Sequence, residues 1–132
     1  MVDFSFANEV TVDRLYEMIG EHGIAGLTAN FYRQVPQNAT LAPMYPADAL
    51  EASEMRLREF LIFRFGGPRR YIEQRGHPRL RMRHAPFPID HTARNEWVAL
   101  MDQAVTEMAF APQVAAVLRS FFHEVATFLI NS

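Results

Sequence analysis

The chain has 132 residues, 49% of them hydrophobic and 21% charged, so it is long enough and apolar enough to bury the core of one domain, expected over residues 1–132. It contains no cysteine, which excludes disulfides, thiol catalysis, cysteine-ligated zinc and iron–sulfur clusters. The net charge of −2 argues against nucleic acid as a partner.

The positive charge is unevenly distributed along the chain. All thirteen basic residues are arginines, and seven of them fall within residues 64–83, where Glu73 is the only acid. That segment carries +6 and leaves −8 for the rest of the chain. Arginine suits bidentate contact with carboxylate or phosphate, although compositional bias and a solvated loop would give the same pattern.

Neither a membrane span nor an export signal is expected. No stretch of about 18 apolar residues occurs, which is the length that a spanning helix requires. The N-terminus lacks a basic segment followed by an apolar one. A cytoplasmic protein is therefore the expectation.

The first third of the chain has helical periodicity. Residues 9–20 predict an amphipathic helix, and residues 22–35 predict a second one after a junction marked by glycines. The residues expected to face the core are Val10, Leu15, Met18 and Ile19 in the first helix and Leu27, Phe31 and Tyr32 in the second. Pro36 and Pro43 bracket a short connection.

A third helix is predicted over residues 47–65. Gly66-Gly67-Pro68 follows it, a pattern typical of a helix C-terminus. Residues at three- and four-residue spacing share one face of this helix: Ser53, Leu57, Phe60, Leu61 and Arg64.

Residues 68–88 contain four prolines, so we expect only one or two short helices there, the last ending near His84. Asp90 is a good N-cap for a helix over 91–109, and Pro112 opens the final helix. The apolar stripes are Trp97, Leu100, Met101, Ala104 and Met108 in the first of these helices and Val114, Leu118, Phe121, Phe122, Val125, Phe128 and Leu129 in the second. No segment alternates as a strand does, so the fold class is all-α.

A histidine beside fixed positive charge is the strongest chemical signal. The block 75–87 contains His77 and His84 together with four arginines. Neutral imidazole binds metals, and the neighbouring arginines suit a ligand with anionic arms. No carboxylate lies at ligand spacing from either histidine, which disfavours a zinc site; the alternative is a histidine in a solvated loop.

Three aromatic residues carry polar hydrogens that require partners when buried. Tyr32 lies in a core-facing stripe, Tyr45 lies between two prolines, and Trp97 is the only tryptophan, thirteen residues after His84. On a helical bundle the three could converge on one small cavity. Core packing is the alternative for each of them alone.

These residues together resemble the group II truncated haemoglobins, small globins in which a two-over-two helical sandwich encloses haem b. The resemblance covers about residues 12–130. It is carried by Phe31-Tyr32, Tyr45-Pro46, the helix through 54–61, Phe65-Gly66-Gly67-Pro68, the block through His84 and Trp97. The glycine pair common in the family is here spread over Gly20, Gly23 and Gly26.

The resemblance implies a role for each matching residue. His84 is the expected proximal iron ligand, with the Leu80 carbonyl accepting a hydrogen bond from its second ring nitrogen. Tyr32, Tyr45, Ser53 and Trp97 are expected to face the bound ligand, with Ser53 leaving the entrance comparatively open. The other expected haem contacts are Leu57, Phe60, Leu61, Phe87 and Met101, and the expected propionate contacts are Arg56 and Arg83, with Arg81 and His77 as weaker candidates.

Hydrogen-bond donors in a dry pocket stabilise the negative charge that bound oxygen develops. We therefore expect high oxygen affinity through slow release, which favours redox chemistry or sensing over bulk transport. The other expected ligands are nitric oxide, carbon monoxide, cyanide and peroxide. Nitric oxide dioxygenation and peroxidase turnover remain open, and either would need a separate reductase because no flavin or nicotinamide motif occurs.

Oligomeric state is left open between monomer and homodimer. The competing reading is a helical module without haem that uses the arginines of 64–83 to bind an acidic partner.

Overall fold

A computed structural model describes residues 9–132 of the chain. The expectation that the chain carries no export signal rests on the extreme N-terminus, and residues 1–8 lie outside the described part. All regular structure in residues 9–132 is helical, as the sequence predicts. None of the helices in this part of the chain combines the length and the apolar character that crossing a membrane requires.

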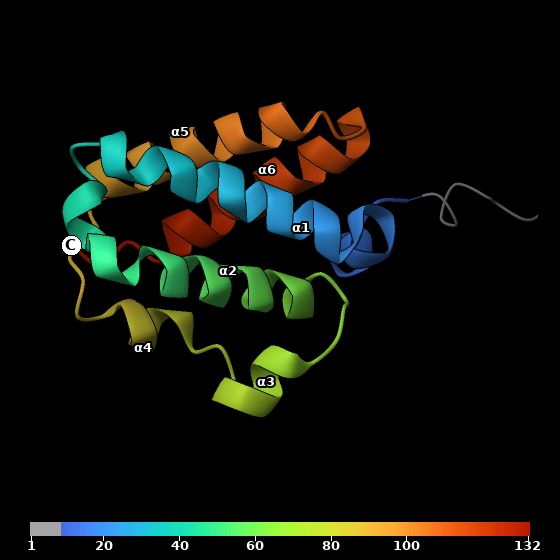
Figure 1. The fold of residues 1–132 in the computed structure, drawn as a ribbon, viewed down its shortest axis with the longest axis horizontal. Coiled ribbons are helices and arrows are strands. Elements are labelled where there is room, and N and C mark those ends of the chain that lie inside the picture. The colour runs from blue at the N-terminus through green and yellow to red at the C-terminus, as the bar shows by residue number, and fades with distance from the viewer. Residues whose placement is uncertain (1–8) are drawn as a thin grey trace, which may run out of the picture.

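Two pairs of long helices make up the fold (Figure 1). One pair is α1 (Leu15–Gln34) and α2 (Leu50–Arg64), and the other is α5 (His91–Met108) and α6 (Pro112–Phe128). Helix α1 packs on both α2 and α5, and α5 packs on α6. Two short helices, α3 (Arg70–Arg75) and α4 (Leu80–His84), lie below α2 in this view. This is the expected two-over-two sandwich.

The N-terminal helix differs from its prediction. Regular α-helix begins only at Leu15, after a 3-10 turn over Val12–Arg14, and Gly20 interrupts it with φ +69°. Leu15 is buried as expected, whereas Met18 is 37% exposed, so its assignment to the core is wrong. Met18 stands at the edge of the stripe that contains Leu15 and Ile19, and the period of a helix does not fix its rotation against its neighbours.

The region between α1 and α2 consists of 3-10 turns. They span Val35–Gln37, Ala42–Met44 and Ala47–Ala49, and α2 begins three residues later than predicted. Proline at the first or second position of two of these turns removes a backbone donor and favours short helical pieces. The arrangement places Tyr45 beside Tyr32, with ring centroids 5.6 Å apart.

The end of α2 is fixed by a glycine. Gly66 has φ +98°, and a Cβ at this position would lie 2.1 Å from the Asp13 carbonyl oxygen. The amide of Tyr16 also donates to the Phe65 carbonyl at 2.9 Å, which ties this turn to the start of α1. Only glycine combines this backbone conformation with so close an approach.

The last two helices begin as predicted. The Asp90 carboxylate accepts a hydrogen bond from the Ala93 amide at 2.8 Å, and Pro112 opens α6. Met101, Leu118 and Phe122 lie in the core. Phe128 is 55% exposed, contrary to its predicted place in the apolar stripe, because it is the last residue of α6 and its ring lies under the Arg81 guanidinium.

Candidate functional site

An apolar cavity of about 430 Å³ lies between the helices. Its wall comes from every long helix and from α4, and the contributing side chains include Tyr32, Leu57, His84, Trp97 and Phe122. The volume lies within the range of small-molecule sites, about 300–1,000 Å³. The predicted residues Tyr45, Ser53, Phe60, Leu61 and Phe87 also line this cavity.

His84 is the last residue of α4 and faces this cavity. Its Nδ1 lies 2.7 Å from the Leu80 carbonyl oxygen, which is the predicted hydrogen bond. A carbonyl can only accept, so Nδ1 must donate, and the neutral ring then keeps its lone pair on Nε2. Because Leu80 lies four residues before His84 in α4, this bond fixes both the tautomer and the orientation of a potential metal ligand.

No other metal ligand set accompanies this histidine. Residues 9–132 contain no group of three or more His, Cys, Asp or Glu side chains able to hold a metal ion. One oriented imidazole in an apolar cavity suits a metal whose other ligands arrive with it, as in haem. The donor set and the cavity thus fit haem better than a metal bound by protein side chains alone.

The polar hydrogens of the cavity belong to one aromatic group. Phe31 packs against Tyr32 and Trp97, with ring centroids 5.0 Å away in each case, and Trp97 also contacts Phe122. Burial raises the pKa of Tyr32 and Tyr45. Hydrogen bonding from Trp97 and Tyr32 partly offsets this rise at Tyr45, which is consistent with the three polar groups lying close together. The three side chains predicted to converge do so.

The raised tyrosine pKa values predict a loss of stability in strong base. A tyrosine whose pKa is raised by folding stabilises the folded protein fully below the unfolded pKa of about 10 and loses that contribution as pH rises through the folded value. Above pH of about 10, the unfolding free energy should fall by up to about 1.4 kcal/mol per pH unit for each such tyrosine. Guanidinium unfolding of the haem-loaded protein measures this slope.

The chain has no lysine or cysteine to titrate in the same range, so the slope reports tyrosines. Tyr32→Phe and Tyr45→Phe should each flatten it. An unchanged slope in both variants would show that the two hydroxyls ionise as readily in the folded protein as in the unfolded chain.

The charged edge of the cavity differs in part from the prediction. Arg56 lines the cavity, and its guanidinium donates to Ser53 Oγ at 3.1 Å, so Ser53 has an arginine beside it at the entrance. Arg83 lines the cavity too, but it donates to the carbonyls of Pro78 at 2.6 Å and Arg75 at 2.8 Å. Much of its guanidinium is therefore committed to the preceding loop.

Three predicted haem contacts do not line the cavity: Arg81, His77 and Met101. Arg81 lies over the Phe128 ring at 5.2 Å, so it points to the outer side of α4. His77 is exposed in the loop before α4, and Met101 is fully buried in the core one turn beyond Trp97. The resemblance therefore implied haem contacts for three residues whose side chains the structure directs elsewhere.

Sequence reasoning missed Tyr71, Arg75 and Arg94, which line the cavity. The Arg75 guanidinium lies 5.9 Å from the centre of the Tyr71 ring, and Arg94 donates to Thr127 Oγ1 at 3.1 Å. Arg94 stands three residues before Trp97 on α5, so helical spacing was a usable signal for it. Tyr71 and Arg75 reach the cavity only through the packing of α3 on α2.

A helical sandwich around an apolar cavity, with one oriented histidine and several polar hydrogens inside, defines a small globin. Comparison with known proteins agrees. Residues 14–131 match the family model described as bacterial-like globin. The chain is 33% identical over 116 residues to the group 2 truncated haemoglobin YjbI of Bacillus subtilis, covering 88% of this chain and 87% of that protein.

Solved structures give the same result. A thermostable haemoglobin from Thermobifida fusca superimposes with a TM-score of 0.86 at 39% identity, covering 89% of this chain and 97% of that one. The truncated oxygen-avid haemoglobin from Bacillus subtilis superimposes with a TM-score of 0.84 at 32% identity, covering 89% and 99%. The chain therefore belongs to the bacterial-like globin family and, within it, to the group II truncated haemoglobins. Its family implies haem as the cofactor and haem-based ligand binding as the function.

Proposed function

We propose that the protein holds haem b through His84 and binds oxygen with high affinity for redox chemistry or sensing, not for bulk transport. Haem supplies the iron at which a diatomic ligand binds. The observation that carries the proposal is one cavity lined by an oriented imidazole and by three polar aromatic side chains, Tyr32, Tyr45 and Trp97. The similarity to the truncated oxygen-avid haemoglobin from Bacillus subtilis supports it.

The chain's own residues would retain the ligand. Tyr32 and Trp97 are donors in a mostly apolar cavity, where a hydrogen bond to a partly charged acceptor is worth about 1.5–3 kcal/mol. Two such donors would slow oxygen release by two or more powers of ten, taking about 1.4 kcal/mol per tenfold. Release that slow is poorly suited to unloading oxygen, which is the reason to propose redox or sensing roles.

The arginines around the cavity would meet the anionic side arms of the haem. Arg56 and Arg75 line the cavity, and neither has a carboxylate partner among the ion pairs of the described residues. Arg83 lines the cavity as well, but its contacts to the loop carbonyls make it the weaker of the predicted propionate contacts. Arg75 thus joins Arg56 as a proposed propionate contact.

An absorption spectrum and a nitric oxide reaction test this proposal. The purified protein should take up one haem and show an intense band near the violet edge, and its ferrous oxygen complex should yield nitrate stoichiometrically when mixed with nitric oxide. Nitrate formation that continues only when a reductase is added would assign enzymatic turnover. A colourless protein that stays so after haem addition would contradict the proposal and favour the reading as a haem-free module.

A further inference from the structure

Arg79 and Arg81, at the start of α4, have no carboxylate partner among residues 9–132. Of the seven arginines in 64–83, only Arg70 forms ion pairs within residues 9–132, to Glu21 and Glu59. Four of the others lie over aromatic rings, and Arg83 binds backbone carbonyls. These contacts hold the guanidinium groups in place without neutralising their charge, so the groups can still bind an anionic partner.

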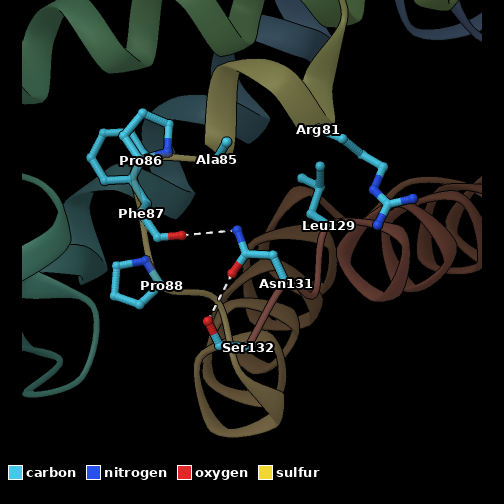
Figure 2. A pocket seen from close by; sticks show the side chains of 8 residues that line it. All are labelled: Arg81, Ala85, Pro86, Phe87, Pro88, Leu129, Asn131 and Ser132. Atoms are coloured by element: carbon cyan, nitrogen blue, oxygen red, sulfur yellow. Dashed lines mark hydrogen bonds between the residues drawn. The ribbon is translucent and has the colours of Figure 1, made fainter.

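The outer side of α4 is also hollowed, with polar and apolar side chains in its wall. A second cavity of about 430 Å³ opens there, with Arg81 and Leu129 on one side and Pro86 and Phe87 on the other (Figure 2). Exposed apolar side chains accompany it: Met82 is 59% exposed, Phe128 55% and Phe87 44%. Arginine, methionine and aromatic residues on one surface are the combination enriched in protein–protein interfaces.

This hollow is held in place by Asn131. The Asn131 side chain donates to the carbonyl of Phe87 at 3.0 Å (Figure 2). It also donates to the carbonyl of His84 at 3.3 Å and accepts from the Ile89 amide at 2.8 Å. Its own amide donates to the Ile89 carbonyl at 2.9 Å. These bonds join the end of the chain to the loop after α4, so the hollow is preformed and a partner would spend little free energy on ordering it.

The hollow and the main cavity share part of their walls. Phe87 and Leu129 line both of them. A protein seated in the hollow would therefore be separated from the proposed haem site by single side chains.

We propose that the surface formed by Arg81, Phe87 and Phe128 at the hollow, with the exposed Arg79 and Met82 on the same short helix or its N-cap, docks an acidic one-electron carrier protein. The inference rests on the proposed haem function. One electron leaves the reduced centre of the carrier and converts ferric haem to ferrous haem, with no transfer of atoms. Acidic side chains of the carrier would pair with the arginines, and its apolar contact would cover Met82 and Phe128.

Reduction by a known acidic carrier tests the proposal. Reduced plant-type ferredoxin is mixed with the ferric haem-loaded protein in a stopped-flow instrument at about 0.01 M and about 0.2 M salt. Arg81→Glu is expected to lower the second-order rate constant about tenfold at low salt and to weaken its salt dependence, because surface charges act mainly on association. Arg81 lies outside the main cavity, so haem binding should be retained.

Arg64→Glu is the matched control. This substitution makes the same change of charge as Arg81→Glu. Arg64 also lies over a phenylalanine ring, but it stands at the end of α2, far from α4 (Figure 1). Its rate constant should stay within about twofold of the original. Equal slowing in both variants would show that the effect comes from net charge alone and would overturn the proposal. An unchanged rate constant in both variants would also overturn it.

Two further measurements separate the possible failures. Calorimetric binding of oxidised ferredoxin should weaken in Arg81→Glu and not in Arg64→Glu, and because it needs no electron transfer it can also be made on haem-free protein. Absence of a haem spectrum would overturn the proposed function. The calorimetric binding of ferredoxin would then test the docking surface independently. Sedimentation that shows a dimer dissociating in Arg81→Glu would assign the surface to a second copy of the chain and overturn the carrier proposal.

Discussion

Replacing His84 by glycine is expected to lower haem affinity by at least about 100-fold, because loss of even an outer partner of a metal ligand costs about 10–100-fold. His84 is the only histidine that lines the main cavity, and its ring is already oriented by the Leu80 carbonyl. The measurement is the rate of haem transfer to an apoglobin acceptor, followed in the visible spectrum. Added imidazole should occupy the space left by the side chain and restore part of the original spectrum.

His77→Gly provides the control for this result. His77 lies in the same arginine-rich segment, is exposed and does not line the cavity, so its loss should leave the rate of haem transfer unchanged. Retention of haem in His84→Gly without imidazole would show that another residue ligates the iron. Equal haem loss in both variants would point to disruption of the segment and not to ligation.

Replacing Trp97 by phenylalanine is expected to accelerate oxygen dissociation about tenfold or more, because one hydrogen bond to a partly charged acceptor is worth about 1.5–3 kcal/mol. The substitution keeps one aromatic ring at a position that contacts Phe31 and Phe122 and removes the indole N–H. Rapid mixing of the oxygen complex with carbon monoxide gives the rate. Tyr16→Phe, outside the cavity, should leave that rate unchanged.

The same experiment in Tyr45→Phe shows how the donors act together. The Tyr45 hydroxyl interacts with both Trp97 and Tyr32, so its removal changes how these two donors are held against the ligand. The effects of Trp97→Phe and Tyr45→Phe should therefore be non-additive, as for other residues in one hydrogen-bond network. Additive effects would show that Trp97 and Tyr45 act on the ligand independently, and an unchanged rate in Trp97→Phe would reject its donor role.

The order of helices and the identity of the central residues could be predicted from the sequence. Gly66, Asp90 and Pro112 fix helix ends through local backbone chemistry, and the structure places all three as predicted. The bond from His84 to Leu80 was also predictable, because a four-residue separation within one helix fixes that geometry. Local interactions of this kind depend on neighbours in the chain, which the sequence displays directly.

The directions of individual side chains depended on tertiary packing. Met18 and Phe128 were expected in the core and are exposed, since the period of a helix does not fix its rotation against its neighbours. Arg81 points away from the main cavity because the Phe128 ring at the end of α6 receives it. The partner in this case comes from a segment far away in the chain, so the local pattern held no information about it.

The helices, the orienting bond of His84 and the polar aromatic residues available to a pocket were thus predictable from the chain alone. The arginines that face the pocket were not: Arg75 and Arg94 line it and Arg81 does not, which depends on how the helices pack. The tertiary structure also decided that a second hollow shares Phe87 and Leu129 with the first. The physical reason is that long, flexible side chains take their direction from contacts between helices, whereas caps, breaks and four-residue bonds arise within a single turn.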